Sequence, residues 1–296
     1  MEEAPHIGRA DPRWFGTRNL VLTGANTYHH VPHFAGPISI KAVTFGEVEW
    51  RLHRRRYVIR PDTLLLLPDG DEYSMTIDSA ELSRTFCPVF RRGLVEDAWR
   101  VLVSSDETLL DSPRNDRSPM FERLWMSRSR SLGQALDRLA TAIAAKESPT
   151  ALGWSFEALG TRTAQAICEQ RGECLRLPSR RPATRLEIHR RLTLAQHAVE
   201  DDLARPWTLV KMANAAAMAP HHFHRCFRTA FRETPRNWLS RRRAERALAL
   251  LRTSNKSIAQ ICLAVGCESA SSFSSSFSAR FGVSPSRVVR PPRHVR

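Results

Sequence analysis

The sequence lacks several features that would assign it quickly to a class of protein. No apolar run approaches the roughly 18 residues of a membrane span, and Leu64 to Leu67, for example, has only the length of a strand. No glycine-rich phosphate loop occurs, and no nucleophile elbow. These absences argue against a membrane protein and give no support to a catalytic function.

Cysteine and histidine patterns are equally sparse. The six cysteines form no C-x-x-C pair, and the polar N-terminus carries no signal-peptide core, so we expect reduced thiols and a cytoplasmic location. His29, His30, His33 and His53 do not have the H-x-H plus Glu spacing of a metal-binding barrel. We therefore expect neither a metal ion nor another cofactor.

Acidic residues are scarce in one part of the chain only. Residues 179–296 hold 7 acidic and 22 basic side chains, whereas residues 1–178 hold 23 of each. The last 118 residues therefore carry the entire net charge of +15. This asymmetry predicts an acidic polymer or surface as the partner of the C-terminal part alone.

Two types of hydrophobic pattern divide the first 171 residues. Residues 1–37 show no sustained period and are interpreted as an irregular arm. Short alternating runs over about 38–90, separated by Pro, Gly and Asp, predict a β-sandwich or small barrel. Helices are expected over about 92–171, including a short one in MFERLWM at 120–126.

Two apolar stripes in this helical stretch could serve either of two purposes. Each repeats at steps of three and four residues, as one helix face requires, and they include Leu136, Leu139, Phe156 and Leu159. The stripes could pack against the β unit or could form a homodimer interface. Residues 172–184, rich in Pro and Arg, have the composition of a linker.

The C-terminal part contains an internal repeat. Phe223, Phe227 and Phe231, followed by Thr234-Pro235, recur as Phe273, Phe277 and Phe281, followed by Ser284-Pro285, at a constant offset of 50. Each set of phenylalanines lies along one helix face, and each Thr/Ser-Pro pair suits the start of another helix. A short helix and a turn precede each set, which predicts helix-turn-helix units over about 208–230 and 257–281.

This duplicated basic unit resembles the C-terminal domain of the AraC/XylS family of bacterial transcription regulators. The resemblance rests on the run RxERAxxLL from Arg243, on IAQIxxxVGC from Ile258 and on FxxxFxxRFGVSP from Phe273. It implies an all-α DNA-binding domain over 185–296, double-stranded DNA as the partner, and RNA polymerase as a second partner if the protein is an activator. The operator and the direction of regulation are left open.

The segment GEVEWRLHRRRYVIRPDTLLLLPDGDEYS resembles the jelly-roll, cupin-like sensor domain of the same family. The predicted fold class is thus α+β and multidomain, with a sensor and dimerisation domain over 1–171. Asp62 replaces the usual glycine, and Tyr73 stands where metal-binding relatives place a histidine. Trp50 and Tyr73 are candidates for binding a small-molecule effector, and both could equally be packing residues.

The resemblance also assigns candidate DNA contacts. In the first unit these are His221, His224, Arg225 and Arg228, with Arg225 suited to a bidentate contact with guanine. In the second unit Ser275 stands where the family usually has arginine, so Ala270, Ser271, Ser272 and Ser275 would contact DNA with little base discrimination. One or two residues of the row Arg241 to Arg243, with Arg243 the chosen candidate, would meet phosphate.

Two alternatives to a ligand-responsive regulator remain open. One is a cupin-type metal enzyme fused to a DNA-binding domain, and the other is a DNA-binding protein that responds to no ligand. Metal analysis distinguishes the first, and ligand screening bears on the second.

Overall fold

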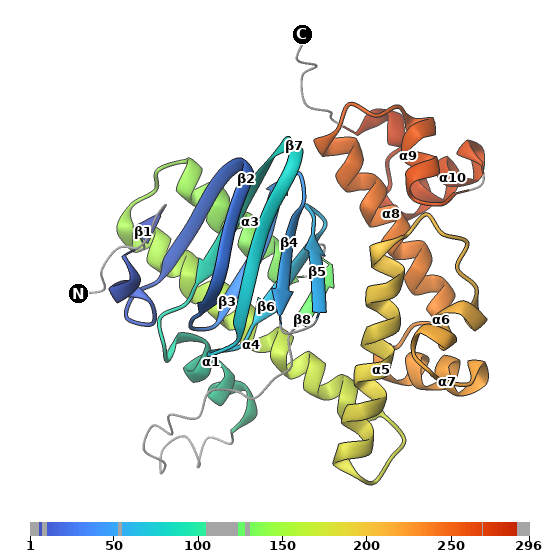
Figure 1. The fold of residues 1–296 in the computed structure, drawn as a ribbon, viewed down its shortest axis with the longest axis horizontal. Coiled ribbons are helices and arrows are strands. Elements are labelled where there is room, and N and C mark those ends of the chain that lie inside the picture. Colours follow the sequence, from blue (N-terminus) through green and yellow to red (C-terminus); the bar gives the residue numbers. More distant parts are fainter. Residues whose placement is uncertain are drawn as a thin grey trace. The chain divides into compact units, whose positions relative to one another are not determined.

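The structure, a computed structural model, describes residues 6–7, 11–52, 55–104, 124–127, 131–267 and 269–288. The chain divides into two compact units, Met1–Gln170 and Arg171–Arg296 (Figure 1). Among the described helices, none is long and apolar enough to cross a membrane.

The described strands of the first unit form one curled sheet in the order β1-β2-β7-β3-β6-β8, with β4 pairing with both β5 and β7. All pairs are antiparallel except β1 with β2. The strands are β1 (His6–Ile7), β2 (Leu20–Ala35), β3 (Ser39–Phe45), β4 (Val48–Leu52), β5 (Arg55–Ile59), β6 (Thr63–Leu67), β7 (Glu72–Val89) and β8 (Leu124–Ser127). The long strand β7 pairs with β4 along its first part and with β3 along its second, which curls the sheet.

Strand β2 corrects the expectation of an irregular arm over 1–37. It pairs with β7 along its length, with irregularities between Asn26 and Tyr28 and between Val31 and Phe34. Most side chains in its second half are exposed, so no hydrophobic alternation marks that part of the strand. Backbone hydrogen bonds to β7 hold it in place, and periodicity in the sequence does not report such bonds.

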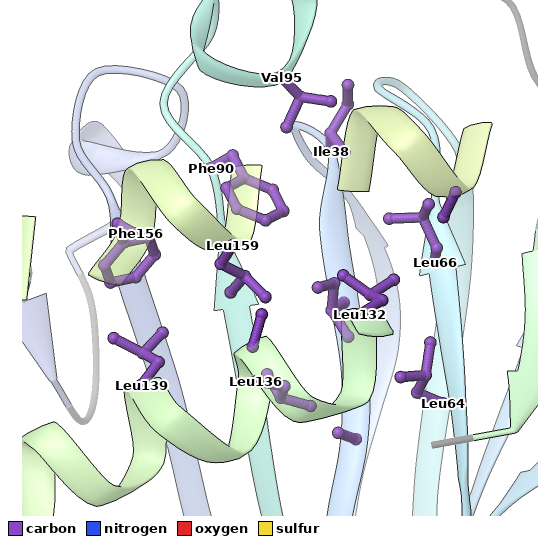
Figure 2. Close-up of a cluster of buried hydrophobic side chains, with 14 of the residues drawn as sticks. Ile38, Leu64, Leu66, Phe90, Val95, Leu132, Leu136, Leu139, Phe156 and Leu159 are labelled. Carbon is purple, nitrogen blue, oxygen red and sulfur yellow. The ribbon is translucent and has the colours of Figure 1, made fainter. Parts of the chain in front are cut away.

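The main core of this unit lies between the sheet and the helices α1 (Leu94–Val103), α3 (Ser131–Ala144) and α4 (Pro149–Arg176) (Figure 2). Leu64 and Leu66 of β6 face it from the sheet, together with Ile38 directly before β3. The four stripe residues lie in this core with no exposed surface: Leu136, Leu139, Phe156 and Leu159. The packing alternative therefore holds for them, because a fully buried side chain cannot contact a second copy of the chain.

Two local expectations are also corrected. In the segment 120–126, residues Leu124 to Met126 belong to strand β8, with Trp125 opposite Leu65 of β6, and residues 120–123 lie outside the described part. Helix α4 continues through Gly172 to Arg176, so the non-helical connection spans only 177–181 instead of 172–184. Contacts with later helices support this extra helical turn despite its glycine.

The second unit is helical: α5 (Pro182–Asp201), α6 (Leu209–Ala215), α7 (Pro220–Phe231), α8 (Pro235–Thr253), α9 (Ile258–Ala264), α10 (Ala270–Phe281) and the 3-10 helix η2 (Pro285–Arg287). Thr234 caps α8 by accepting a hydrogen bond from the Asn237 amide, as the Thr-Pro pair predicts. Ser284 precedes η2 without a side-chain capping bond.

The two phenylalanine helices organise two separate cores. Phe223 and Phe227 pack with Trp238 of α8 in the first. Phe273 and Phe277 pack with Leu251 of α8 in the second. Helix α8 thus contributes its first half to one helix-turn-helix and its second half to the other, which connects them in a single unit.

Candidate nucleic-acid interface

The second helix of the first helix-turn-helix, α7, has one buried and one exposed face. Phe223, Cys226 and Phe227 have no exposed surface, which fixes the orientation of the helix. The opposite face carries exposed His221, Arg225 and Arg228, with His224 half-buried beside it. The Arg225 guanidinium lies 3.3 Å from the His222 ring. All four predicted contacts of this unit therefore lie on the part of α7 that faces away from the core.

Helix α10 has the same construction but a different chemistry. Phe273 and Phe277 are buried, and Ser271, Ser272 and Ser275 are exposed, together with Ala270. Ser269 caps the helix by accepting a hydrogen bond from the Ser272 amide. The exposed face offers hydroxyl groups, and its arginine, Arg280, stands in the last turn.

A cleft of about 1310 Å³ separates the two phenylalanine helices. Its walls include His224 of α7 together with Ser272 and Ser276 of α10, and residues of α8 lie between them. Two exposed arginines also line it, Arg236 in the first turn of α8 and Arg280 of α10. Sequence reasoning missed both, since an isolated arginine on a helix carries no signal until its neighbours are known.

The row of three arginines on α8 is occupied by contacts within the protein. Arg242 is 1 % exposed and pairs with Glu200 and Glu245, while Arg241 pairs with Glu233 and Glu245.

Arg243, the candidate phosphate contact, donates hydrogen bonds to the carbonyl oxygens of Leu203 (3.1 Å) and Arg205 (2.9 Å). Its guanidinium therefore holds the segment before α6 against α8, although the residue also lines the cleft.

The end of α4 that belongs to the second unit packs against the first helix-turn-helix. Arg176 donates two hydrogen bonds to the Ala230 carbonyl near the end of α7. The buried His189 ring of α5 lies 3.0 Å from the Glu173 carboxylate. Burial alone would lower the pKa of His189. Hydrogen bonds to Cys174 and Glu173 outweigh this effect and raise the pKa to about 9. His189 is therefore positively charged at neutral pH.

In the first unit, Trp50 of β4 and Tyr73 of β7 belong to a second apolar cluster on the other side of the sheet. Trp50 is 2 % and Tyr73 9 % exposed, so both act as packing residues in this state. The Tyr73 hydroxyl accepts a hydrogen bond from Lys41 of β3 at 2.9 Å. Lys41 is buried as well, and sequence reasoning missed it because a single charged residue in ISIKAVTF looks like strand alternation.

Two histidines of β2 have individual partners. His30 contacts the Thr76 hydroxyl at 3.0 Å, and His33 lies 3.9 Å from Glu72. Within the ranges that the structure describes, no group of three or more His, Cys, Asp or Glu side chains is arranged to hold a metal ion.

Known protein families contain domains similar to both units of this chain. The model of the AraC-like ligand binding domain matches residues 20–155, and a model of a helix-turn-helix domain matches residues 212–290. The virulence regulon transcriptional activator VirF of Yersinia enterocolitica is 26% identical over 253 residues, which cover 82% of this chain and 85% of VirF.

Two further similarities each cover about a third of the chain. The regulator CdhR of Pseudomonas aeruginosa is 36% identical over 112 residues, covering 37% of this chain and 33% of CdhR. The solved DNA-binding domain of AdpA in complex with target DNA is 26% identical over 32% of this chain and 86% of that one, and its TM-score of 0.31 is too low to add weight. The two domain matches and the similarity to VirF across both units show that this chain belongs to the AraC/XylS family of DNA-binding transcriptional regulators.

Proposed function

We propose that this regulator reads DNA mainly through α7, whereas α10 mainly positions it on the duplex. The observation that carries the proposal is the contrast between the exposed faces of two helices with the same buried face. Arg225 and Arg228 can bond guanine or phosphate, while Ser271 and Ser275 can meet phosphate or several bases.

In this arrangement the two helices enter successive major-groove segments, about 10 base pairs apart, on one face of the DNA. The sugar-phosphate backbone of the DNA between these two segments then runs past the cleft, where Arg236 and Arg280 are exposed. Both arginines are better candidates for phosphate contact than Arg243, because the hydrogen bonds of Arg243 to two carbonyl oxygens already orient its guanidinium.

Selection of bound duplexes from a random-sequence library tests this division of roles. The enriched sequences should show one half-site of strong base preference and, about one helical turn away, a half-site of weak preference. Two half-sites of equal information, or no enrichment at all, would contradict the proposal.

We further propose that the protein acts as a homodimer. We also propose that the first unit responds to an effector bound beside Tyr73 and Lys41. These two residues supply polar groups to a largely apolar cluster, as specific ligand sites require. The effector would act by favouring one arrangement of the chain over another, and an activator would also contact RNA polymerase.

Thermal-shift screening of the full chain and of the Tyr73→Phe variant tests the effector site. A compound that stabilises the wild type but not the variant would support it. Stoichiometric iron or zinc in the purified protein would instead favour the metal-enzyme alternative, and the absence of any stabilising compound would favour the ligand-independent one.

A further inference from the structure

The turn of each helix-turn-helix is a Schellman motif, in which the two residues that follow the helix bond back to its last turn. In the second unit the Gly266 amide donates to the Leu263 carbonyl and the Cys267 amide to the Cys262 carbonyl, each at 3.0 Å. Gly266 has a φ of +74°, which the motif requires at this position. The motif characteristically brings together the side chains of its first and last residues, here Cys262 and Cys267.

The first unit contains the same motif with other side chains. The Ala217 amide bonds to the Asn214 carbonyl at 2.9 Å and the Met218 amide to the Ala213 carbonyl at 3.0 Å. The pair equivalent to the two cysteines is therefore Ala213 and Met218. The fold needs only a small residue and an apolar residue at these positions, so it does not itself demand two thiols.

The two thiols differ in accessibility. Cys262 is 4 % exposed, and its Sγ donates to the Cys267 carbonyl at 3.4 Å. Cys267 is half-buried and lines the open cleft, so a small solute can reach it. The Cys267 sulfur is therefore accessible to an oxidant, and the buried Cys262 sulfur lies in the same turn.

We propose that Cys262 and Cys267 form a peroxide-sensitive disulfide that switches the second helix-turn-helix. The Cys267 thiolate attacks one oxygen of hydrogen peroxide, so that an S–O bond forms, the O–O bond breaks and hydroxide leaves as water after taking up a proton. The Cys262 sulfur then attacks the sulfenic acid, an S–S bond forms, the S–O bond breaks, and a second water leaves. The two thiols lose two electrons and two protons, and one peroxide is reduced to two waters.

The position of the pair gives the disulfide a consequence for DNA binding. Cys267 lies two residues before Ser269, the cap residue of α10. Its neighbour Gly266 is packed tightly, because a Cβ there would lie 2.6 Å from the Ala204 carbonyl oxygen and 2.8 Å from Arg243. Because the turn is packed against Ala204 and Arg243, we infer that a new cross-link would displace the start of α10. This consequence rests on the proposed function, whereas formation of the disulfide does not.

The reaction should be slow at neutral pH and faster at higher pH. Burial and the neighbouring Cys262 raise the pKa of the Cys267 thiol, although Arg243 acts in the opposite direction. Only the thiolate is the nucleophile, so the rate should increase as the pH approaches the pKa of the thiol.

Mass spectrometry of the full chain after peroxide treatment and alkylation detects the bond. Trypsin releases residues 257–280 as one peptide that contains these two cysteines and no other. The oxidised peptide should lack both alkyl groups and two hydrogens, and reduction should restore full alkylation. A peptide that remains fully alkylated after peroxide overturns the proposal.

Fluorescence anisotropy with a labelled duplex from the selected pool measures the switch. Oxidation should weaken binding about 5-fold or more, and reduction should reverse the loss. The variants Cys267→Met and Cys262→Ala copy the residues of the first unit, so they should fold and bind as the reduced protein does with or without peroxide. An equal loss of affinity in the peroxide-treated variants would overturn the switch, and so would a disulfide that leaves the affinity unchanged. Reduced protein that binds no duplex would instead contradict the proposed function.

Discussion

Arginine occurs in two chemically different settings in the DNA-binding unit, and only the tertiary structure separates them. Arg225 and Arg228 are exposed on α7, whereas Arg242 is buried against two carboxylates. Exposed guanidinium groups remain available to a nucleic acid, while a buried and paired group cannot leave its partners without a large penalty.

At the exposed setting, Arg225→Ala should cost about 1–3 kcal/mol at the selected site and relax the base preference at one position, because a bidentate contact with guanine is lost. Equilibrium binding to selected and random duplexes measures both effects. The matched control is Arg138→Ala, which removes an exposed arginine from the first unit. An equal loss on random DNA would show that Arg225 meets phosphate.

At the buried setting, Arg242→Ala should reduce the free energy of unfolding by about 3–5 kcal/mol, because Glu200 and Glu245 would keep buried carboxylates without their cation. Denaturant unfolding followed by fluorescence measures the loss. Arg236→Ala, at an exposed position of the same helix, should change stability by less than about 0.5 kcal/mol. Similar values for the two variants would refute the structural role of Arg242.

At the scale of elements, the end of α4 depends on contacts with the helices that follow it. The Glu173–His189 pair and the Arg176 bonds to Ala230 support a helical turn in a segment with the composition of a linker. Composition reports the intrinsic preference of the segment, and these partners come from residues distant in sequence.

The Glu173–His189 pair predicts a dependence of stability on pH. The pKa of His189 rises from 6.5 to about 9 on folding, so its contribution is fully present below pH 6.5 and is lost as pH rises through about 9. Thermal unfolding across this window should show a decline in the wild type that is absent in His189→Gln. Parallel profiles for the two proteins would exclude a charged His189.

Helices α3 and α4 give a second prediction at this scale. Leu136→Ala should reduce stability by about 2–5 kcal/mol through loss of buried contacts in the core of the first unit, with no change in oligomeric state. Denaturant unfolding and light scattering measure the two properties. The exposed neighbour Gln134→Ala provides the control. A stable monomer from an oligomeric wild type would restore the interface interpretation.

At the scale of the whole molecule, the net charge of the second unit governs association with DNA. If about 6–10 phosphates are contacted, the logarithm of the binding constant should fall with the logarithm of salt concentration with a slope of about −5 to −9. Anisotropy titrations at several salt concentrations measure the slope. Arg236→Ala should make it shallower by about 1, and a flat response in the wild type would exclude electrostatic binding to DNA.

The sequence by itself determined the helix-turn-helix repeat, the cap Thr234 of α8 and the separation of charge between the two parts of the chain. These features are local or periodic, so spacing along the chain encodes them directly. The constant offset of the phenylalanines required no knowledge of their partners, yet the structure buries Phe223, Phe227, Phe273 and Phe277 as the spacing predicts.

Only the tertiary structure decided which residues are available to other molecules. It showed strand β2, whose second half has no alternation, buried the stripe of α3 and α4, and paired Arg241 and Arg242 with glutamates. The physical reason is common to all three cases: burial and pairing depend on neighbours contributed by other segments, and a residue's own type and spacing do not specify them.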